Sequence, residues 1–533
     1  MEPSRGQSWL TIGASAAAAA FAYLVIKFIQ HRRFYKDLPK PPYDFIWGHL
    51  KLMGEITSLF PSNCHVQVYI TTISRKYKLP GLWYLDLWPL GPTFLVITDP
   101  DLALYITVQK NHPKHPVEQE FIAPIVGENN IVAAEGPAWK YLHNMLAPPF
   151  AISAVRNLAE MMSEEVMVFR STLHKLAKTR EVFRLEDISS NLTFDVVAKA
   201  TFGFSLNAQT KGNPAIHDFS EICRAFVIEK NSWNFVKKFF ATRKRKSATK
   251  RLDSQLEKMI RERFVVLQRD NVDVSQKRGL SIADLILRER INEGRDLNPE
   301  FMETAITSIK TMLLGGTGTT TDTVCFIFML LSVHPEIVEK LREEHDRVFT
   351  PGIDATYAMI QDSSQKLSEL TYTTNVIKET LRFYPVGNTA RGEDATGFVT
   401  YKGQQYSTKG HIILPVQHSM QNNPDVFPNP KAFDPDRFTR EDFIRHAWRP
   451  FERGPRACLG QALAMDELRI ILLLTVREFD FQCADIKPNR KPRVEWTDLD
   501  VTFGDRAFQE FIFEAKPRDG MKMTVRESGK GVD

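Results

Sequence analysis

One cysteine, Cys458, lies in the stretch "PFERGPRACLGQAL", shortly after two arginines and directly before a helical run. A thiolate is a strong, soft ligand for iron, but its negative charge must be stabilised inside a protein. The helix that we predict to begin near Leu459 would direct its free N–H groups and the positive end of its dipole at the sulfur. An axial thiolate pushes electron density onto haem iron and favours O–O cleavage. The spacing therefore predicts that Cys458 is an iron ligand.

The other residues of this loop suit a flat, negatively charged cofactor. Gly454 and Gly460 permit a close approach of backbone to its surface. Arg456 supplies a fixed positive charge for a carboxylate on the cofactor edge. The ring of Phe451 can cover the sulfur and exclude water. The alternative interpretation of Cys458, as of any single cysteine, is a small buried hydrophobic residue.

The remaining cysteines indicate no second site. They are Cys64, Cys223, Cys325 and Cys483, widely spaced and without a CxxC pair. This pattern argues against a disulfide framework and against a zinc knuckle.

A second unusual stretch is the apolar run "NPEFMETAITSIKTMLLGGTGTTTDTVCFIFMLLSVHP". Asn298 suits an N-cap, Pro299 suits the first helical position, and His334-Pro335 marks the end. Because the run is apolar on nearly all faces, we predict a long buried helix.

The centre of this helix contains glycine and threonine from Gly315 to Thr321. Each glycine inside a helix costs about 1 kcal/mol relative to alanine. Two interpretations explain them: close packing against another backbone, or a loosened turn that faces a cofactor and holds water on threonine hydroxyls.

The elements that must position these residues are mainly helical. The chain has 533 residues, with 43% hydrophobic and 25% charged residues, an ordinary balance for a globular protein. Helical periodicity covers residues 151–177, 250–270 and 335–349, whereas short strand-like stretches cover residues 82–89, 93–98, 411–417 and 521–527. We predict one large, mainly α domain with a small β region.

The formal net charge of +5 is small, and no basic stripe is interleaved with aromatic residues, so nucleic-acid binding is not indicated. The basic segment Lys237–Leu252 is interpreted as a solvated helix face or as a contact with anionic lipid.

The N-terminal region predicts a membrane anchor. The uncharged run Trp9–Ile26 would span about 27 Å as a helix, near the thickness of the bilayer core. Lysines and arginines follow it, which places the rest of the chain on the cytoplasmic side. We assign residues 1–38 to the anchor and its basic flank, and residues 39–533 to a catalytic domain that starts with a stiff proline-rich linker. A cleaved secretory or mitochondrial signal is the alternative.

The cysteine loop resembles a known signature. Phe451, Gly454, Arg456, Cys458 and Gly460 match the pattern FxxGxRxCxG of the cytochromes P450, the haem-thiolate monooxygenases. The resemblance spans roughly residue 39 to the C-terminus, and with the anchor it is typical of the microsomal type. The sequence "PFERGPR" is similar to that of filamentous-fungal family members that act in secondary metabolism.

Other motifs of the family follow in the same order. "ETLR", Glu379 to Arg382, resembles its ExxR motif, and Arg437 of "FDPDRF" resembles the third member of its structural Glu–Arg–Arg network. Trp139 stands where the WxxxR motif places its tryptophan, and Arg391 stands where members often contact a haem propionate.

The resemblance implies roles for these residues. Cys458 would ligate the iron of haem b, and Trp139, Arg391 and Arg456 would hold the propionates. Thr319, followed by Thr320, would be the distal threonine that hydrogen-bonds the dioxygen substrate. A reductase would deliver electrons from NADPH, with cytochrome b5 as an accessory donor.

The chain departs from the family pattern at two positions. His143 replaces the arginine of WxxxR and offers less fixed charge to a propionate. Gly318 replaces the acid of the distal motif (A/G)Gx(D/E)TT, which helps to relay protons. Three explanations stay open: water held by Thr319 and Thr320 with help from Asp322, a hydroxyl group on the substrate, or a reaction other than ordinary oxygen activation.

The substrate pocket is predicted from segments rather than from motifs. Val117–Val132 would cap it, and its lining would come from Thr311, Leu314, Gly315, Val386, Gly387 and Asn388. These mostly small or apolar residues suit a lipophilic substrate reached from the membrane, such as a terpenoid or a polyketide, and sterols and fatty acids fit as well.

The sequence thus predicts an endoplasmic-reticulum enzyme with one membrane span and a cytosolic catalytic domain, which oxygenates a lipophilic intermediate. The alternatives are a haem-thiolate isomerase or dehydratase that needs no reductase, and a haem sensor without enzymatic activity.

Overall fold

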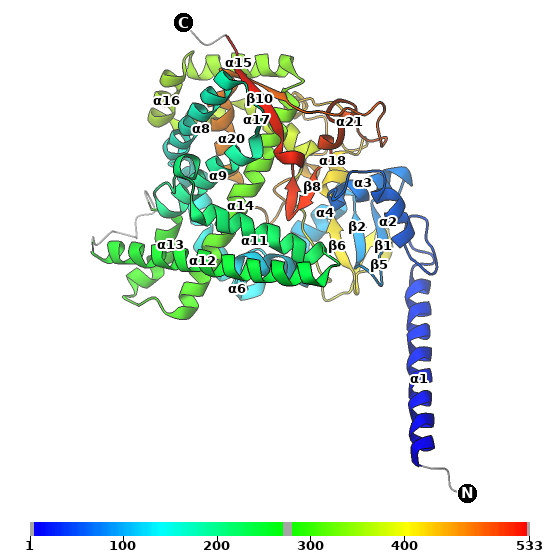
Figure 1. Ribbon diagram of the computed structural model, residues 1–533. Helices are drawn as coiled ribbons and strands as arrows, with labels where there is room; N and C mark the ends of the chain where they lie inside the picture. The colour runs from blue at the N-terminus through cyan, green and yellow to red at the C-terminus, as the bar shows by residue number, and fades with distance from the viewer. Residues whose placement is uncertain (1–4, 270–279, 530–533) are drawn as a thin grey trace.

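The computed structural model describes residues 5–269 and 280–529, with side chains from residue 14 onward (Figure 1). The predicted fold class is confirmed: helices form most of the body, and short strands form small separate sheets among them. The helices are α1 (Arg5–Phe34), α2 (Leu50–Thr57), α3 (Val66–Lys76), α4 (Pro100–Leu104), α5 (Pro116–Val126), α6 (Gly136–Leu146), α7 (Ile152–Arg156), α8 (Ala159–Thr179), α9 (Leu185–Phe202), α10 (Ala208–Lys211), α11 (Pro214–Asn231), α12 (Phe235–Arg269), α13 (Ile282–Asn292), α14 (Pro299–Leu331), α15 (Pro335–Phe349), α16 (Ile353–Asp362), α17 (Thr371–Phe383), α18 (Gln417–Gln421), α19 (Arg437–Arg440), α20 (Gln461–Thr475) and α21 (Leu499–Phe503).

The strands form four small sheets within the described residues. They are β1 (Leu82–Asp86), β2 (Thr93–Ile97), β3 (Phe183–Arg184), β4 (Phe398–Tyr401), β5 (Gln404–Ser407), β6 (Ile412–Pro415), β7 (Phe479–Cys483), β8 (Glu510–Ile512), β9 (Glu514–Lys516) and β10 (Lys522–Glu527). Two sheets have three strands, in the orders β1-β2-β6 and β3-β10-β7, and two are the hairpins β4-β5 and β8-β9. β2 pairs with β6 in parallel, so residues more than 300 positions apart share one sheet.

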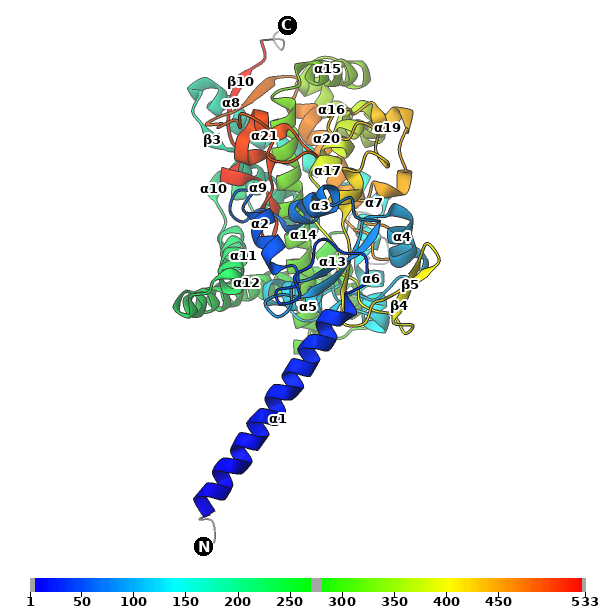
Figure 2. The same ribbon diagram turned by 90° about the vertical axis from the view of Figure 1, so that its right-hand side faces the viewer.

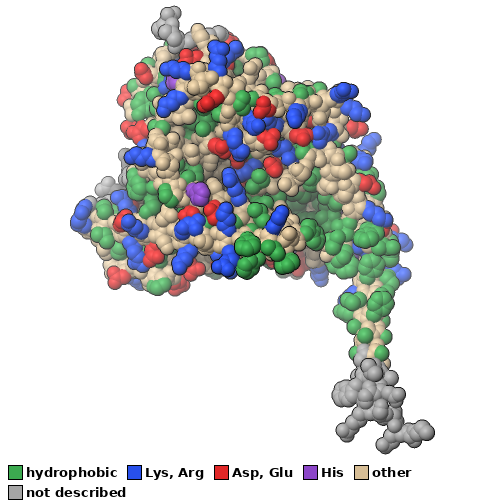
Figure 3. All heavy atoms as spheres, in the orientation of Figure 1, with side chains coloured by type: hydrophobic (Ala, Val, Ile, Leu, Met, Phe, Trp, Pro, Cys, Tyr) green, Lys and Arg blue, Asp and Glu red, His purple; other side chains and the backbone are tan. Residues whose placement is uncertain are grey.

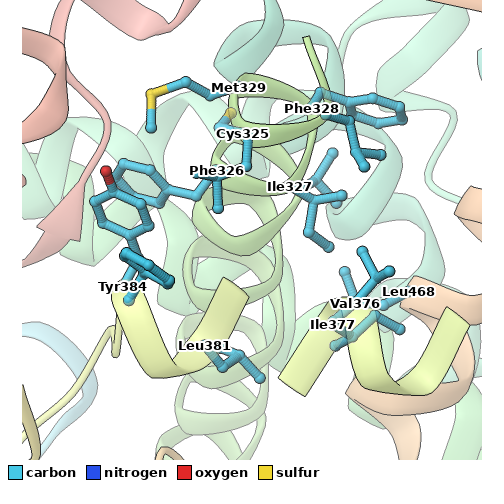
Figure 4. Packing of buried hydrophobic residues seen from close by; sticks show 14 of the residues in the cluster. Cys325, Phe326, Ile327, Phe328, Met329, Val376, Ile377, Leu381, Tyr384 and Leu468 are labelled. Atoms are coloured by element: carbon cyan, nitrogen blue, oxygen red, sulfur yellow. The ribbon is translucent and has the colours of Figure 1, made fainter. Parts of the chain in front are cut away.

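Helix α14 is the axis of the body, and its ends follow the predicted signals. The side chain of Asn298 accepts a hydrogen bond from the N–H of Phe301 at 2.9 Å, and Pro299 is the first helical residue. The C-terminal part of α14 packs on α17 and α20. Figure 4 shows Phe326 against Tyr384, whose rings stack with centroids 4.1 Å apart, and Ile327 near Ile377. The prediction of a buried helix is therefore confirmed.

The N-terminal helix projects away from the body (Figures 1 and 2). Two described stretches are long and apolar enough to cross a membrane, Ala14–Phe34 and Pro299–Leu331. The second is 78% buried and belongs to the core, whereas the first has none of its span buried in the protein. Ala14–Phe34 is therefore the candidate membrane span.

The base of α1 is attached to the body by polar contacts. Arg32 is buried and forms an ion pair with Asp86 at the end of β1, and it also donates to the carbonyl oxygens of Ile46 (2.8 Å) and Trp88 (2.9 Å). The hydroxyl of Tyr35 lies 3.0 Å from Nε2 of His411. The proline-rich segment that follows is not a free spacer, because it packs on β1 and accepts a hydrogen bond from the N–H of Tyr84.

Most predicted elements are present, with shifted ends. The helix expected over residues 151–177 is divided into α7 and α8, and that expected over 250–270 is part of the longer α12, with Asp270 outside the described residues. The predicted strands correspond to β1, β2, β6 and β10. The hairpin β8-β9 was not predicted.

Candidate functional site

The loop before α20 is a tight turn closed by its own backbone. The N–H of Cys458 donates to the carbonyl of Phe451 at 2.9 Å, and the N–H of Ala457 donates to that of Gly454 at 3.0 Å. Gly454 has a φ of +85°, and a Cβ at this position would lie 2.8 Å from the carbonyl oxygen of Thr107. Only glycine fits here, because both the backbone conformation and the neighbouring chain exclude a side chain.

The side chain of Cys458 is accessible, although protein atoms surround the loop that carries it. Burial raises the pKa of the Cys458 thiol, and the N–H groups of Gly460 and Gln461 act in the opposite direction. Helix α20 begins at Gln461 with Gly460 as its N-cap, two residues later than predicted, because the chain still turns at Leu459. The thiol is therefore protonated in the free protein, and a bound cation would be needed to stabilise the thiolate.

Arg456 and Trp139 lie against each other. The guanidinium of Arg456 lies 4.9 Å from the centroid of the ring of Trp139, a residue in the first turn of α6. The same guanidinium donates to Glu135 Oε1 at 3.0 Å and to the carbonyl oxygens of Val132 (3.1 Å) and Ala134 (2.8 Å). The structure thus brings these two predicted residues together. It also binds Arg456, by hydrogen bonds, to the segment that precedes α6.

Arg391 is a buried cation with unused hydrogen-bond donors. Its Nη1 donates to the carbonyl of His112 at 2.9 Å, whereas Nε and Nη2 have no partner among the described residues. Burial lowers the pKa of Arg391, with Arg456 adding to the effect. A buried guanidinium with unpaired N–H groups is costly, which indicates a site for an anion.

Lys114 is a third cation beside this site. Its backbone pairs with that of Arg391, and its Nζ lies 2.7 Å from Oγ1 of Thr389 and 3.5 Å from Oε1 of Glu118. Burial lowers the pKa of Lys114, and the nearby charges of Arg391 and Arg456 add to this effect while Glu118 opposes it. The arrangement of Lys114, Arg391 and Arg456 fits the propionate carboxylates of haem, and the accessible thiol of Cys458 fits its iron.

The glycine–threonine centre of α14 is regular helix, so the prediction of a loosened turn is wrong. A Cβ at Gly316 would overlap Cγ2 of Val197 on α9, and a Cβ at Gly318 would overlap Oε2 of Glu514 on β9. These two glycines serve close packing, but against the side chains of Val197 and Glu514 rather than against another backbone as the second interpretation had it. Gly315 is exposed, with open space where its side chain would be.

Thr319 and Thr320 differ in their surroundings. Thr319 is partly accessible, and its hydroxyl donates to the carbonyl of Gly315 at 2.6 Å. Because its single proton is used within the helix, the oxygen of Thr319 can only accept a further hydrogen bond. Thr320 is buried at 2% exposure, which leaves Thr319 as the more accessible threonine of the pair.

The other predicted residues are distributed around this region. The ring of His143 packs on Trp139, with centroids 4.8 Å apart. Thr311 and Leu314 are buried in α14, and the hydroxyl of Thr311 donates to the carbonyl of Thr307. The remaining pocket residues, which are Val386, Gly387 and Asn388, lie in the irregular segment after α17 and are exposed or half-buried.

Glu379, Arg382 and Arg437 form one buried network. Nε of Arg382 lies 2.8 Å from Oε2 of Glu379, and Nε of Arg437 lies 3.4 Å from Oε1. The free donors of Arg382 bind the carbonyl oxygens of Gln421 and Pro430. The network therefore ties α17 to the irregular segment that leads to the Cys458 loop.

Two residues of this region were not found from the sequence. Lys114 had only a weak signal, its place between the prolines of "HPKHP". Glu514 had none, because its approach to Gly318 joins positions almost 200 residues apart.

Comparisons with known proteins agree with this geometry. The family model "Cytochrome P450" matches residues 46–499. The "Cytochrome P450 monooxygenase polC" of the fungus Polytolypa hystricis is 28% identical over 525 residues, covering 92% of this chain and 91% of that protein. The "Cytochrome P450 monooxygenase acrF" of Aspergillus aculeatus is 28% identical over 498 residues, covering 88% of this chain and 99% of that protein.

A solved structure shows the same fold. The "Crystal structure of cytochrome P450DA heme domain" superposes with a TM-score of 0.73 at 20% identity, covering 93% of this chain and 99% of that one. The resemblance deduced from the cysteine loop is confirmed, and the chain belongs to the cytochrome P450 family, as an enzyme of the monooxygenase class.

Proposed function

We propose that this protein is a membrane-anchored haem-thiolate monooxygenase that oxygenates a lipophilic intermediate of secondary metabolism, such as a terpenoid or a polyketide. Electrons come from NADPH through a cytochrome P450 reductase, with cytochrome b5 as an accessory donor. The observation that carries the proposal is Cys458, an accessible thiol directly before the N-terminus of α20.

Haem b, when bound to Cys458, supplies the redox centre at which dioxygen is activated. The chain's own residues bind and orient this group. Arg391 offers two unpaired N–H donors to a propionate, and Lys114 and Arg456 add positive charge beside it. Trp139 contacts Arg456, and the ring of His143 packs on Trp139, so both residues of α6 lie near this group of cations. Phe451 and Gly454 close the loop that presents the sulfur.

Thr319 is the distal residue that handles protons in this proposal. Its oxygen can accept a hydrogen bond from water, because its own proton is donated to the carbonyl of Gly315. Gly315 leaves open space for the substrate beside it. Thr311, Leu314 and the segment Val386–Asn388 complete the proposed pocket.

The anchor and a second hydrophobic region support attachment to a membrane. Trp233 and Phe235, at 94% and 80% exposure, lie at the start of α12, and Phe239 and Phe240 are also exposed. Figure 3 shows hydrophobic side chains gathered on the lower face of the body, near the base of α1 and again nearer its middle. Exposed aromatic residues on the side from which the anchor leaves are typical of a surface that rests on lipid.

The proposed topology follows from these features. Residues 1–38 form the anchor with its basic flank, and residues 39–533 form the catalytic domain on the cytosolic face of the endoplasmic reticulum. A lipophilic substrate would then reach the pocket from the membrane. The basic segment Lys237–Leu252 follows the exposed aromatic residues on α12, which favours contact with anionic lipid over simple solvation.

The experiment uses the full-length protein in microsomes with its reductase. We expect the reduced carbon monoxide complex to show the spectrum of thiolate ligation, and Cys458→Ala to abolish it. Cys483→Ser, which changes another half-buried cysteine, should leave the spectrum intact. A thiolate spectrum that persists in Cys458→Ala would show that the ligand is a different residue.

Deletion of the gene in the source organism tests the reaction. An accumulated intermediate one oxygen atom lighter than the lost product supports hydroxylation or epoxidation. A precursor of equal mass, or one that differs by water, would identify an isomerase or dehydratase and would contradict the proposal.

A further inference from the structure

The acid that the distal helix lacks is replaced in space by a residue from another part of the chain. Gly318 stands where the family pattern has Asp or Glu. A Cβ at Gly318 would overlap Oε2 of Glu514 and would lie 2.7 Å from its Cδ and 2.8 Å from its Oε1. The carboxyl of Glu514 therefore occupies the volume that a side chain at residue 318 would fill.

The hairpin that carries Glu514 is fixed by aromatic contacts. Phe513, at the turn between β8 and β9, stacks on Phe121 of α5 with ring centroids 4.8 Å apart and an interplanar angle of 6°. Phe226 of α11 packs against the edge of Phe513 at 6.1 Å. Because the turn is held on two helices, the next residue, Glu514, is directed at α14 rather than at solvent.

The carboxyl of Glu514 is free to act on a further group. It makes no hydrogen bond or ion pair with any residue that the structure describes, although it is only partly accessible. An unpaired carboxyl inside a protein is costly when ionised. Carboxyl groups in such an environment are found mostly at functional sites, where they bind a ligand or exchange a proton.

A charged cluster lies near Glu514, whose carboxyl feels the charges of Lys516 and Glu186. Lys516 of β9 lies 3.4 Å from Oδ1 of Asp322 on α14 and 3.1 Å from Oε1 of Glu186 on α9. Glu186 in turn lies 3.6 Å from the half-exposed Arg184. Asp322 is fully buried, and its Oδ2 has no partner among the described residues.

Glu514 and Asp322 have higher pKa values than exposed carboxyl groups. Burial raises the pKa of Glu514 to about 7, with Lys516 opposing and Glu186 adding to the effect. Burial also raises the pKa of Asp322 well above its ordinary value. Burial, with the charge of Glu514 adding to it, raises the pKa of Cys223 of α11 to about 12, so this thiol stays neutral. A carboxyl that changes its protonation near neutral pH is suited to general acid catalysis.

We propose that Glu514 of β9 supplies, across the fold, the proton-donating carboxyl that Gly318 cannot supply from α14. The inference rests on the proposed monooxygenase function. Oxygen insertion releases the second oxygen atom of dioxygen as water, so it consumes protons together with the electrons from NADPH. Each proton leaves the Glu514 carboxyl toward the distal side of the site through water, with the oxygen of Thr319 accepting a hydrogen bond that orients this water, and the carboxylate regains a proton from solvent.

The variants separate this role from others. Glu514→Gln keeps the shape and removes the acid. Gly318→Asp adds an acid on α14 but overlaps Glu514, and the double variant Gly318→Asp with Glu514→Ala moves the carboxyl from β9 to α14. Glu510→Gln, on strand β8 of the same hairpin, is the matched control.

The first readout requires no turnover. Infrared difference spectra of the haem-loaded full-length enzyme, taken on either side of neutral pH, should show a carboxyl that loses its proton. We expect this signal to weaken in Glu514→Gln and to keep its amplitude in Glu510→Gln. A signal of wild-type amplitude in Glu514→Gln would overturn the proposal.

The second readout is the coupling of NADPH oxidation in the reconstituted system. We expect Glu514→Gln to lower turnover about a hundredfold and to release peroxide, while its carbon monoxide spectrum stays normal. The double variant should recover most of the loss. A loss that the double variant does not recover, a rise in KM with kcat unchanged, or a turnover equal to that of Glu510→Gln would each overturn the proposal.

Failure of the broader function would look different. If the wild-type enzyme showed no thiolate spectrum and no NADPH-dependent turnover, the monooxygenase function would be wrong, whereas the infrared signal would still decide whether Glu514 is the exchanging acid.

Discussion

Arg391 donates one hydrogen bond to the backbone carbonyl of His112, at 2.9 Å, and buries the rest of its guanidinium without a partner in the described chain. The backbone carbonyl of His112 positions the positive charge of Arg391 but, being neutral, does not compensate it. The contrast with Arg456, whose donors bind Glu135 and several carbonyl oxygens, separates two cations that the sequence treated alike.

Replacing Arg391 should therefore have opposite effects on the free and the haem-loaded protein. We expect Arg391→Met to raise the thermal midpoint of the apoprotein, since it removes an uncompensated buried charge. In the haem-loaded protein we expect haem to dissociate at least about tenfold faster, because charge-assisted hydrogen bonds are lost. Thermal unfolding and transfer of haem to an acceptor protein measure the two effects. Arg456→Met is the control and should destabilise both forms.

The Glu379 network predicts a large loss of stability. Glu379→Ala leaves the buried guanidinium groups of Arg382 and Arg437 without their carboxylate, and breaking a buried pair in this way costs about 3–5 kcal/mol. The control is Glu262→Ala on α12, whose partner Lys258 lies 3.9 Å away at the surface. That exposed pair is worth less than about 1 kcal/mol. Equal denaturation midpoints for the two variants would contradict the network's structural role.

The packing of α9 on α14 can be tested at Gly316. Gly316→Ala should destabilise the protein by about 1–3 kcal/mol, because the new methyl overlaps Val197. Combining it with Val197→Ala should recover part of the loss in a double-mutant cycle. Gly315→Ala is the comparison: it meets open space and should stabilise the helix by about 1 kcal/mol. If the two alanine variants had the same stability, the close approach at Gly316 would be refuted.

The pKa of Glu514 predicts how stability depends on pH. The carboxyl has its ordinary pKa in the unfolded chain and a pKa of about 7 in the folded protein. Between these values the folded protein binds more protons, so its contribution is fully present in acid and is lost as the pH rises toward neutral. We expect Glu514→Gln to have a thermal midpoint that falls less between acidic and mildly alkaline buffer than that of the wild type. Asp322, with its own raised pKa, keeps part of the dependence in the variant. An unchanged dependence would mean that Glu514 is ionised throughout.

The parts of the fold that depend on local signals were predictable. Asn298 and Pro299 marked the start of α14 because capping depends on neighbouring residues, and the Cys458 loop was recognisable because its spacing is short and its residue types are distinctive. The Glu–Arg–Arg network was predicted from the family resemblance, because only Glu379 and Arg382 lie on one helix and the third member, Arg437, is far along the chain.

What depended on distant contacts was missed or wrong. The glycines at the centre of α14 were ambiguous, because the residues that pack on them, Val197 and Glu514, are about 120 to 200 positions away in the sequence. The division of one predicted helix into α7 and α8 likewise depends on how each part packs. Lys114 lies in the site because its backbone pairs with that of Arg391, a contact between positions far apart in the sequence.

The attachment of α1 has a practical consequence for preparing a soluble form of the enzyme. A truncation at residue 38, the boundary suggested by the sequence, would remove Arg32 and Tyr35 and leave Asp86 buried without its cation and His411 without its hydroxyl partner. A truncation that starts upstream of His31 removes the exposed apolar part of the helix and keeps these contacts. The shorter deletion should therefore yield more folded protein than the one that follows the apparent domain border.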